Sequence, residues 1–237
     1  MTEIKLTGIK YPTLMASLKE FKGAQNKRNL DNPYETAKVE DDFNEIALHL
    51  LYGGYFEVSG DCIDTYRIYL HTIEFYYHEE DKDGFKDYIV YHRNGKNSFK
   101  PAFPVGSLHT HVSGIDLTFE DNRDMDNPRY RASVLIRTFK VARNHNGKWV
   151  LENFANPRYK EKPELEAYPT HLYEYLFMKA NINGLCIKWI DTPIKNLKDI
   201  SLFTGKRFNV FLYNEKGKKT ETSDGREWAY TKDTQLY

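Results

Sequence analysis

Cysteine is scarce in this chain, because only Cys62 and Cys186 occur among 237 residues. They form no Cys-x-x-Cys motif, and two cysteines are too few for the disulfide scaffold of a small secreted protein. We therefore expect both residues to be free thiols in a reducing cytoplasm.

Long apolar runs are also lacking, since no stretch approaches the ~20 residues that a membrane-spanning helix needs. The N-terminal residues 1–5 do not contain the apolar segment of a signal peptide. We expect a cytoplasmic protein without a membrane partner, with a monomer as the default state.

Neither sign of charge is in excess. The 34 Lys and Arg residues balance 34 Asp and Glu residues, and the pI is about 7.1. Proteins that bind nucleic acid through its phosphates usually carry a basic excess, so a DNA-binding function here requires a local basic face. The Gly-x-Gly-x-x-Gly, Walker and Gly-x-Ser-x-Gly motifs of nucleotide-binding and hydrolase folds are absent as well.

Aromatic residues, in contrast, are abundant, with 18 Tyr and 14 Phe making up most of a 15% share. Such residues favour strands and provide stacking surfaces. Alternation with a period of two and turn residues predict strands at 66–78, 88–92, 106–113, 115–119, 132–142, 148–154, 185–190 and 208–213. Apolar residues at helical spacing predict helices at 13–22, 41–52 and 170–180.

This order of elements predicts the fold class, a single α+β domain with a mixed, mostly antiparallel curved sheet flanked by a few helices. We expect a loose N-terminal arm at residues 1–39 and one domain at 40–237. Within that domain, the core lies at 45–154, a C-terminal helix and strands at 170–213, and an exposed polar tail at 214–237.

Two charged residues fall on apolar strand faces. Glu74 shares its predicted face with Ile68 and Leu70, and burial there would raise the pKa of a carboxyl group toward the range of acid–base catalysts. Arg137 lies on an equally apolar face and needs a partner, because an unpaired buried charge is very unfavourable. Arg137 either pairs structurally with a carboxylate such as Glu74, or it reaches a phosphate or a bound base.

The densest polar cluster spans residues 106–116. His109 and His111 share a strand face there, and Asp116 follows a glycine bend. A His-x-His pair can provide two zinc ligands, and the segment resembles the JAMM-type zinc hydrolases. Their motif continues with a Ser and an Asp at positions where this chain has Phe119 and Asn122. The third ligand is therefore missing in register, and we expect no metal and no cofactor; ordinary hydrogen-bonded strand histidines are the alternative.

Taken in order, the segments resemble the alkyladenine (3-methyladenine) DNA glycosylase superfamily. Residues 50–53, Leu-Leu-Tyr-Gly, are similar to the family's Leu-Leu-Gly run, and residues 70–76 are similar to its Ile-Val-Glu-Thr-Glu-Ala-Tyr motif. Residues 132–137, Ala-Ser-Val-Leu-Ile-Arg, match its Ala-Val-Leu-Ile-Arg-Ala strand. The resemblance covers residues 45–141. His109 and His111 replace two tyrosines of the family's Tyr-Val-Tyr strand, and the tyrosine that intercalates into DNA has no counterpart.

The resemblance implies an enzyme that hydrolyses the N-glycosidic bond of an alkylated purine flipped out of double-stranded DNA. Glu74 would be the general base that activates water. Substrate binding would fall to the residues that clamp the base or hold a phosphate: Tyr76, Tyr77, His92, His109, His111, Asp116 and Arg137. Two alternatives remain open. One is a non-catalytic module that binds a nucleotide, nucleic acid or protein on the same scaffold, and the other is a zinc hydrolase using the His-x-His segment.

Overall fold

The computed structural model describes residues 1–23, 35–60, 65–81, 84–87, 89–92, 101–155, 160–178, 184–208, 210–213, 219–223 and 225–232. The helical elements are α1 (Leu14–Glu20), α2 (Glu35–Tyr52), the short helices η2 (Pro169–His171) and η4 (Leu197–Asp199), and the π-helical turn η3 (Glu174–Met178). The strands are β1 (Thr2–Ile4), β2 (Gly54–Ser59), β3 (Tyr66–Glu79), β4 (Leu108–His111), β5 (Gly114–Thr118), β6 (Tyr130–His145), β7 (Lys148–Leu151), β8 (Cys186–Asp191), β9 (Leu202–Gly205), β10 (Phe211–Tyr213), β11 (Lys219–Ser223) and β12 (Ala229–Thr231).

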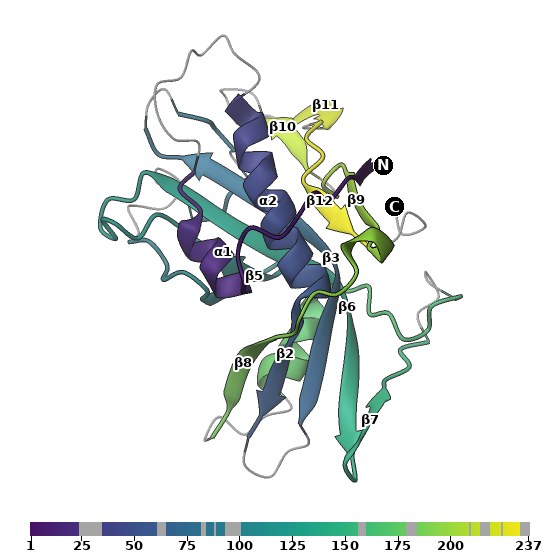
Figure 1. Ribbon diagram of the computed structural model, residues 1–237. Coiled ribbons are helices and arrows are strands. Elements are labelled where there is room, and N and C mark those ends of the chain that lie inside the picture. The colour runs from purple at the N-terminus through teal and green to yellow at the C-terminus, as the bar shows by residue number, and fades with distance from the viewer. Residues whose placement is uncertain are drawn as a thin grey trace.

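One large curved sheet organises these elements. Its strands follow the order β1-β9-β12-β3-β6-β5-β4, while β2 pairs with β3 and β8, and β7 pairs with β6. All pairs among the described strands are antiparallel, and β10 and β11 form a separate two-stranded sheet. The predicted α+β fold with a mostly antiparallel curved sheet is confirmed. Figure 1 shows α2 lying across the long strands β3 and β6, which form the spine of the sheet.

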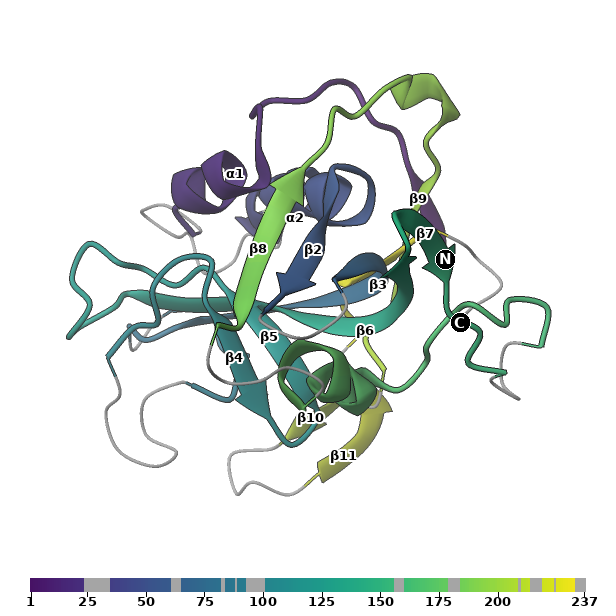
Figure 2. The same cartoon turned by 90° about the horizontal axis from the view of Figure 1, so that it is seen from below.

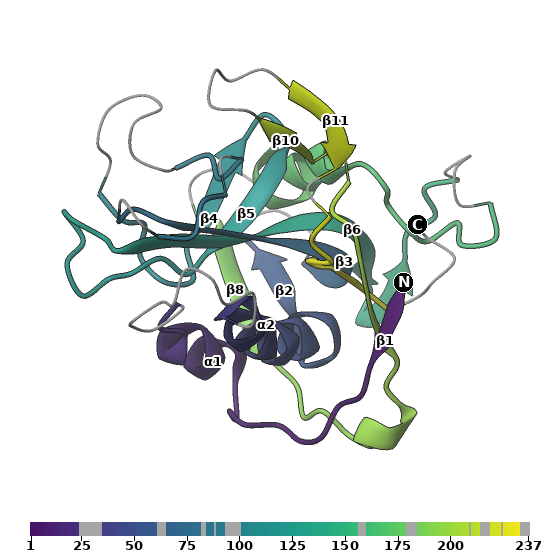
Figure 3. The same ribbon diagram turned by 90° about the horizontal axis from the view of Figure 1, so that it is seen from above.

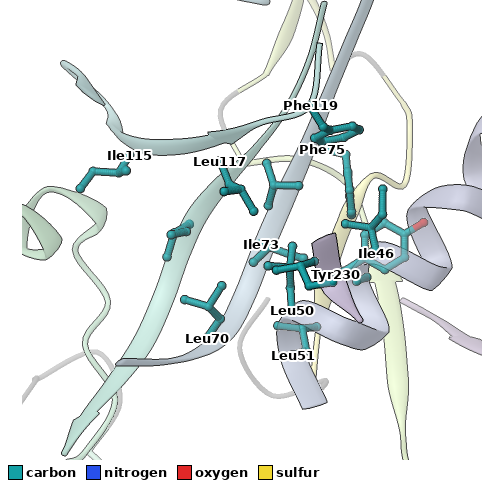
Figure 4. Packing of buried hydrophobic residues seen from close by; sticks show 14 of the residues in the cluster. Ile46, Leu50, Leu51, Leu70, Ile73, Phe75, Ile115, Leu117, Phe119 and Tyr230 are labelled. Atoms are coloured by element: carbon teal, nitrogen blue, oxygen red, sulfur yellow. The ribbon is translucent and has the colours of Figure 1, made fainter. Parts of the chain in front are cut away.

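Alternating side chains of the spine build the core against α2. Phe75 of β3 stacks on Phe43 of α2 with ring centroids 4.2 Å apart, and Tyr230 of β12 packs edge-to-face on Phe75. Ile73 and Leu117 point into the same cluster (Figure 4). The residues of β3 that alternate with these, including Glu74 and Tyr76, face away from α2, where η3 and the small β10–β11 sheet lie (Figure 2). Burying an aromatic layer of this kind is the main stabilising term of the fold.

Residues 1–23 and 228–231 pack against the rest of the fold, in contrast to the loose arm and the exposed tail that the sequence predicted. The N-terminal arm is not loose over residues 1–23, because β1 pairs with β9 and α1 buries Leu14 and Leu18. The predicted exposed tail is wrong for residues 228–231. Trp228 and Tyr230 are buried, because β12 fills the place between β3 and β9 (Figure 3).

The spans of most elements agree with their predictions. The helices at 13–22 and 41–52 correspond to α1 and α2, and Gly53 closes α2 by donating its N–H to His49. The strand predicted at 88–92 is wrong over the described residues 89–92, which form a turn. Five of the described strands were not predicted, namely β1, β2, β9, β11 and β12. Of the two cysteines, Cys186 is a free thiol, and Cys62 lies outside the described residues. No described helix has both the length and the apolar character of a membrane span.

Candidate functional site

Glu74 and Arg137 form an ion pair on the face of the spine opposite α2. The register of β3 and β6 shifts twice near its middle, from Leu70 opposite Phe139 to Ile73 opposite Ile136, and this leaves Arg137 without an opposite residue in β3. The Nη2 atom of Arg137 lies 2.7 Å from Oε2 of Glu74. The predicted Glu–Arg pair is therefore present.

The carboxylate of Glu74 is completely buried and accepts two further hydrogen bonds. The hydroxyl of Tyr76 donates to Oε2 at 2.9 Å, and the backbone N–H of Phe208 donates to Oε1 at 2.7 Å. Burial, and then the charge of Glu74, raises the pKa of Tyr76 well above its usual value, so its hydroxyl remains a donor. Both oxygens of Glu74 are thus engaged by the protein, and its side chain holds Arg137 in place.

Asp116 is the second carboxylate of the site. It lies on β5 with His109 opposite it on one side and Leu135 opposite it on the other. The hydroxyl of Ser133 donates to its Oδ2 at 3.1 Å, and Nε2 of His111 lies 3.1 Å from its Oδ1. Burial raises the pKa of Asp116, but His111 and the nearby His92 outweigh this effect and lower the pKa to about 2. Asp116 is therefore ionised at neutral pH.

The hydrogen bonds of His111 identify its tautomer. The backbone N–H of Ser113 donates to Nδ1 at 3.3 Å, so this nitrogen is the acceptor of the ring. The proton of a neutral imidazole then resides on Nε2 and faces Asp116.

An aromatic cluster surrounds these polar groups. Tyr91 stacks on His111 with centroids 5.6 Å apart, and His109 packs edge-to-face on His92 at 4.0 Å. Phe103 completes the cluster 4.5 Å from His109. His92 is held in the turn that replaces the predicted strand, and its ring is almost completely buried with Nε2 3.9 Å from Oδ2 of Asp116.

A cavity of about 280 Å³ opens between these elements. Tyr76, Tyr91 and Phe208 provide aromatic walls, and Val90, Leu135 and Val210 provide aliphatic ones. The polar wall consists of His111, Ser113, Asp116, Ser133 and Arg137. Glu74 lies directly behind Arg137 and Tyr76. The geometry can hold one small ring system and present it with a carboxylate.

Seven of the eight predicted site residues come together. Tyr76, His111, Asp116 and Arg137 line the cavity, whereas Glu74, His92 and His109 support its walls. The prediction is wrong for Tyr77, which does not lie at the cavity. It follows Tyr76 in a strand and therefore points to the opposite face, where its ring packs against Phe21 and Tyr130 in the core.

Sequence reasoning missed Tyr91 and Phe208. Tyr91 directly precedes His92, a predicted site residue, so its position in the sequence could have indicated a place in the site. Phe208 is far from the other site residues in sequence and acts through its backbone, which accepts from Arg137 and donates to Glu74. No side-chain pattern could have identified such a contact.

The part of the chain that the structure describes contains no arrangement of side chains suited to bind a metal ion. There, no three His, Cys, Asp or Glu side chains converge on a position that a metal ion could occupy. Comparisons of the chain with protein-family models, with curated proteins and with solved structures gave no match.

Proposed function

We propose that the 280 Å³ cavity binds a flat ring with positive charge, and that an N-alkylated purine is the ligand class that fits best. The observation that carries this proposal is the ionised Asp116 in the wall of an aromatic cavity. Arg137 offers no free positive charge in return, because Glu74 already pairs with it. Among the described residues, Asp116 is thus a carboxylate of the cavity wall that faces histidines and pairs with no Lys or Arg side chain.

The walls match this ligand in shape as well. The volume lies just below the roughly 300–1,000 Å³ that is usual for small-molecule pockets, which suits a single ring system better than an extended ligand. Tyr76, Tyr91 and Phe208 line the cavity, and a ring face that meets a cationic ligand contributes about 0.5–2 kcal/mol. Alkylation at a ring nitrogen gives a purine this charge, whereas an unmodified purine is neutral.

A second candidate function is hydrolysis of the N-glycosidic bond of that purine, and the position of Asp116 favours it. Positive charge develops on the sugar carbon as the base departs, and a buried carboxylate beside the base stabilises it or orients the attacking water. Glu74 then acts as a positioning residue for Arg137. In this version the ligand reaches the cavity as a base flipped out of damaged double-stranded DNA.

A paired ligand and a paired variant test the proposal. We expect 7-methylguanosine, which is cationic, to bind about tenfold more tightly than guanosine in calorimetric titration, a difference of about 1.4 kcal/mol. Asp116→Asn should remove this preference, while Asp126→Asn, which changes an exposed aspartate, should leave it intact. Equal binding of the two nucleosides by the native protein, or no binding of either, would contradict the proposal.

The same variants separate binding from hydrolysis. If the cavity is catalytic, the native protein releases base from alkylated duplex DNA, and Asp116→Asn lowers the rate by about 10²–10⁴. Binding of 7-methylguanosine without base release from DNA or nucleoside assigns the cavity to a non-catalytic module.

A further inference from the structure

We propose that a second cavity, on the α2 face of the sheet, binds an organic anion with a flat ring, and that Lys232 is its main charged contact. This cavity measures about 500 Å³ and lies between the end of α2 and β7. Its lining includes Tyr69, His71, Lys140, Trp149, Leu151 and Lys232. Tyr69 and His71 alternate along β3 with Glu74 and Tyr76, so the two cavities use opposite faces of one strand.

The unusual feature of this cavity is a lysine without a counter-ion. Lys232 directly follows β12, and its backbone N–H donates to His71 at 3.3 Å, which holds the residue against the sheet. Its Nζ lies 4.7 Å from the centroid of the Tyr52 ring. Among the described residues no carboxylate pairs with it. A sequestered ammonium group without a partner is unfavourable, and a bound anion would provide that partner.

The surrounding charges reinforce the preference for an anion. Lys140 from β6 lines the same cavity and pairs with Glu164 at 2.8 Å. The charge of Lys162 also acts on His71, in the same direction as those of Lys140 and Lys232. Burial, and then these lysines, lowers the pKa of His71 to about 3, which leaves the ring neutral and able to hydrogen-bond at neutral pH.

Aromatic and apolar surfaces define the other half of the ligand. Trp149 lies in the wall, and the guanidinium of Arg67 stacks 3.9 Å from its ring centroid. Tyr69 adds a second ring, and Leu151 is an apolar residue of the rim with 50% of its surface exposed. A ring that packs on these surfaces can place an attached carboxylate or phosphate near Lys232. The expected ligand class is thus an aromatic anion whose negative charge belongs to either a carboxylate or a phosphate.

Three probes distinguish these sources: benzoate, adenosine 5′-monophosphate and inorganic phosphate, each titrated by NMR at pH 7. We expect one of the two ring-bearing anions to bind more tightly than inorganic phosphate, and its identity assigns carboxylate or phosphate. Lys232→Met should weaken that anion at least tenfold. The matched control is Lys188→Met, which changes an exposed lysine on β8 and should have no effect.

Folding does not confound this test. Methionine removes a partly buried charge and keeps the length of the side chain, so Lys232→Met should melt at or above the native temperature. Lys232→Arg keeps the charge and should retain anion binding. No millimolar or tighter binding of any probe, or unchanged affinity in Lys232→Met, would overturn the proposal.

The dependence on pH gives an independent readout. Burial, and then Lys140, lowers the pKa of Lys232 to about 8. Benzoate stays ionised well above that pH, so its affinity should fall between pH 8 and 9.5 as Lys232 loses its proton. Among the described residues, the other titratable groups around Lys232 are Lys140, Lys162, Glu164, His71, Tyr69 and Tyr52. Burial raises the pKa of Tyr52, which keeps it neutral over this range. Constant benzoate affinity across this interval also contradicts the assignment.

Discussion

The two cavities of this protein share the β3–β6 spine but differ in the charge that is left uncompensated. On the face opposite α2, Glu74 neutralises Arg137 and the ionised Asp116 remains. On the α2 face, Glu164 neutralises Lys140 and the cationic Lys232 remains. A chain whose formal charge is zero therefore contains two sites of opposite polarity. Net charge describes long-range attraction and does not limit what a single cavity recognises.

The two ion pairs differ in burial, and this predicts the largest effect. Glu74 is fully buried and Arg137 is 18% exposed, whereas Lys140 and Glu164 are both 29% exposed. Glu74→Gln should lower the free energy of unfolding by about 3 kcal/mol, because Arg137 loses its counter-charge inside the protein. Glu164→Gln should cost less than about 1 kcal/mol, as is typical for a solvent-screened pair.

Urea unfolding of a double-mutant cycle measures this difference. Glu74→Gln combined with Arg137→Met should be more stable than the sum of the two single losses implies, because the second change removes the stranded charge. Additive losses at Glu74 and Arg137, or an equally large loss at Glu164, would show that the pairs do not differ in the way their burial indicates.

A second prediction uses the different pH ranges over which the charged groups of the two cavities titrate. The pKa of Lys232 is about 8 in the folded state against a usual 10.5, so the unfolded chain binds more protons between these values. Stability linked to Lys232 should therefore rise with pH over this range, by about 2 kcal/mol once partial exposure is allowed for. Lys232→Met should lack this rise, which denaturant unfolding from pH 7 to 10.5 measures against the native protein.

Asp116 gives a change of the same sign in the acidic range. Its folded pKa of about 2 lies below the usual 3.8, so the unfolded chain again binds more protons between them. Its contribution, also about 2 kcal/mol, is complete above pH 4 and disappears as the pH falls to 2. Asp116→Asn should flatten this part of the stability profile and leave the alkaline part unchanged. An alkaline change in Asp116→Asn would mean that the two cavities are coupled through the spine.

The long strands β3 and β6, and the polar residues on one face of them, were predictable from the sequence. The alternation of side chains between the two faces of a strand depends only on neighbouring residues. Residues 66–78 and 132–142 carry a clear period of two, which places Glu74, Tyr76 and Arg137 on one face. The cluster of His109, His111 and Asp116 was predictable for the same reason. Each of these assignments needs only neighbours in the sequence.

The remaining features depend on contacts between distant segments. Strand β12 reaches β3 from the far end of the chain, so a polar-looking tail becomes part of the sheet and delivers Lys232 to its cavity. Phe208 closes the first cavity from a similar distance. The pairing partner of a short strand is decided by which edge is free, and no local pattern records that choice. The second cavity could therefore not be predicted from the sequence.

The smallest expected effect compares two adjacent tyrosines. The Tyr76 hydroxyl donates to Glu74 behind the first cavity, and the Tyr77 hydroxyl donates to Glu79 in the core. Replacing either by Phe removes one buried hydrogen bond and should cost about 1 kcal/mol of stability. Only Tyr76→Phe should also weaken 7-methylguanosine binding, by about threefold, because it loosens the support of Arg137 while keeping the aromatic wall.

Calorimetric titration beside thermal melting resolves this pair, since the two variants are expected to match in stability and differ in affinity. The neighbouring positions differ only in the face of β3 to which they point, so each serves as the control for the other. Weakened binding in Tyr77→Phe at native-like stability would mean that the α2 face also shapes the first cavity. Unchanged binding in Tyr76→Phe would mean that the ligand does not depend on the Glu74–Arg137 pair, and the recognition would then rest on Asp116 alone.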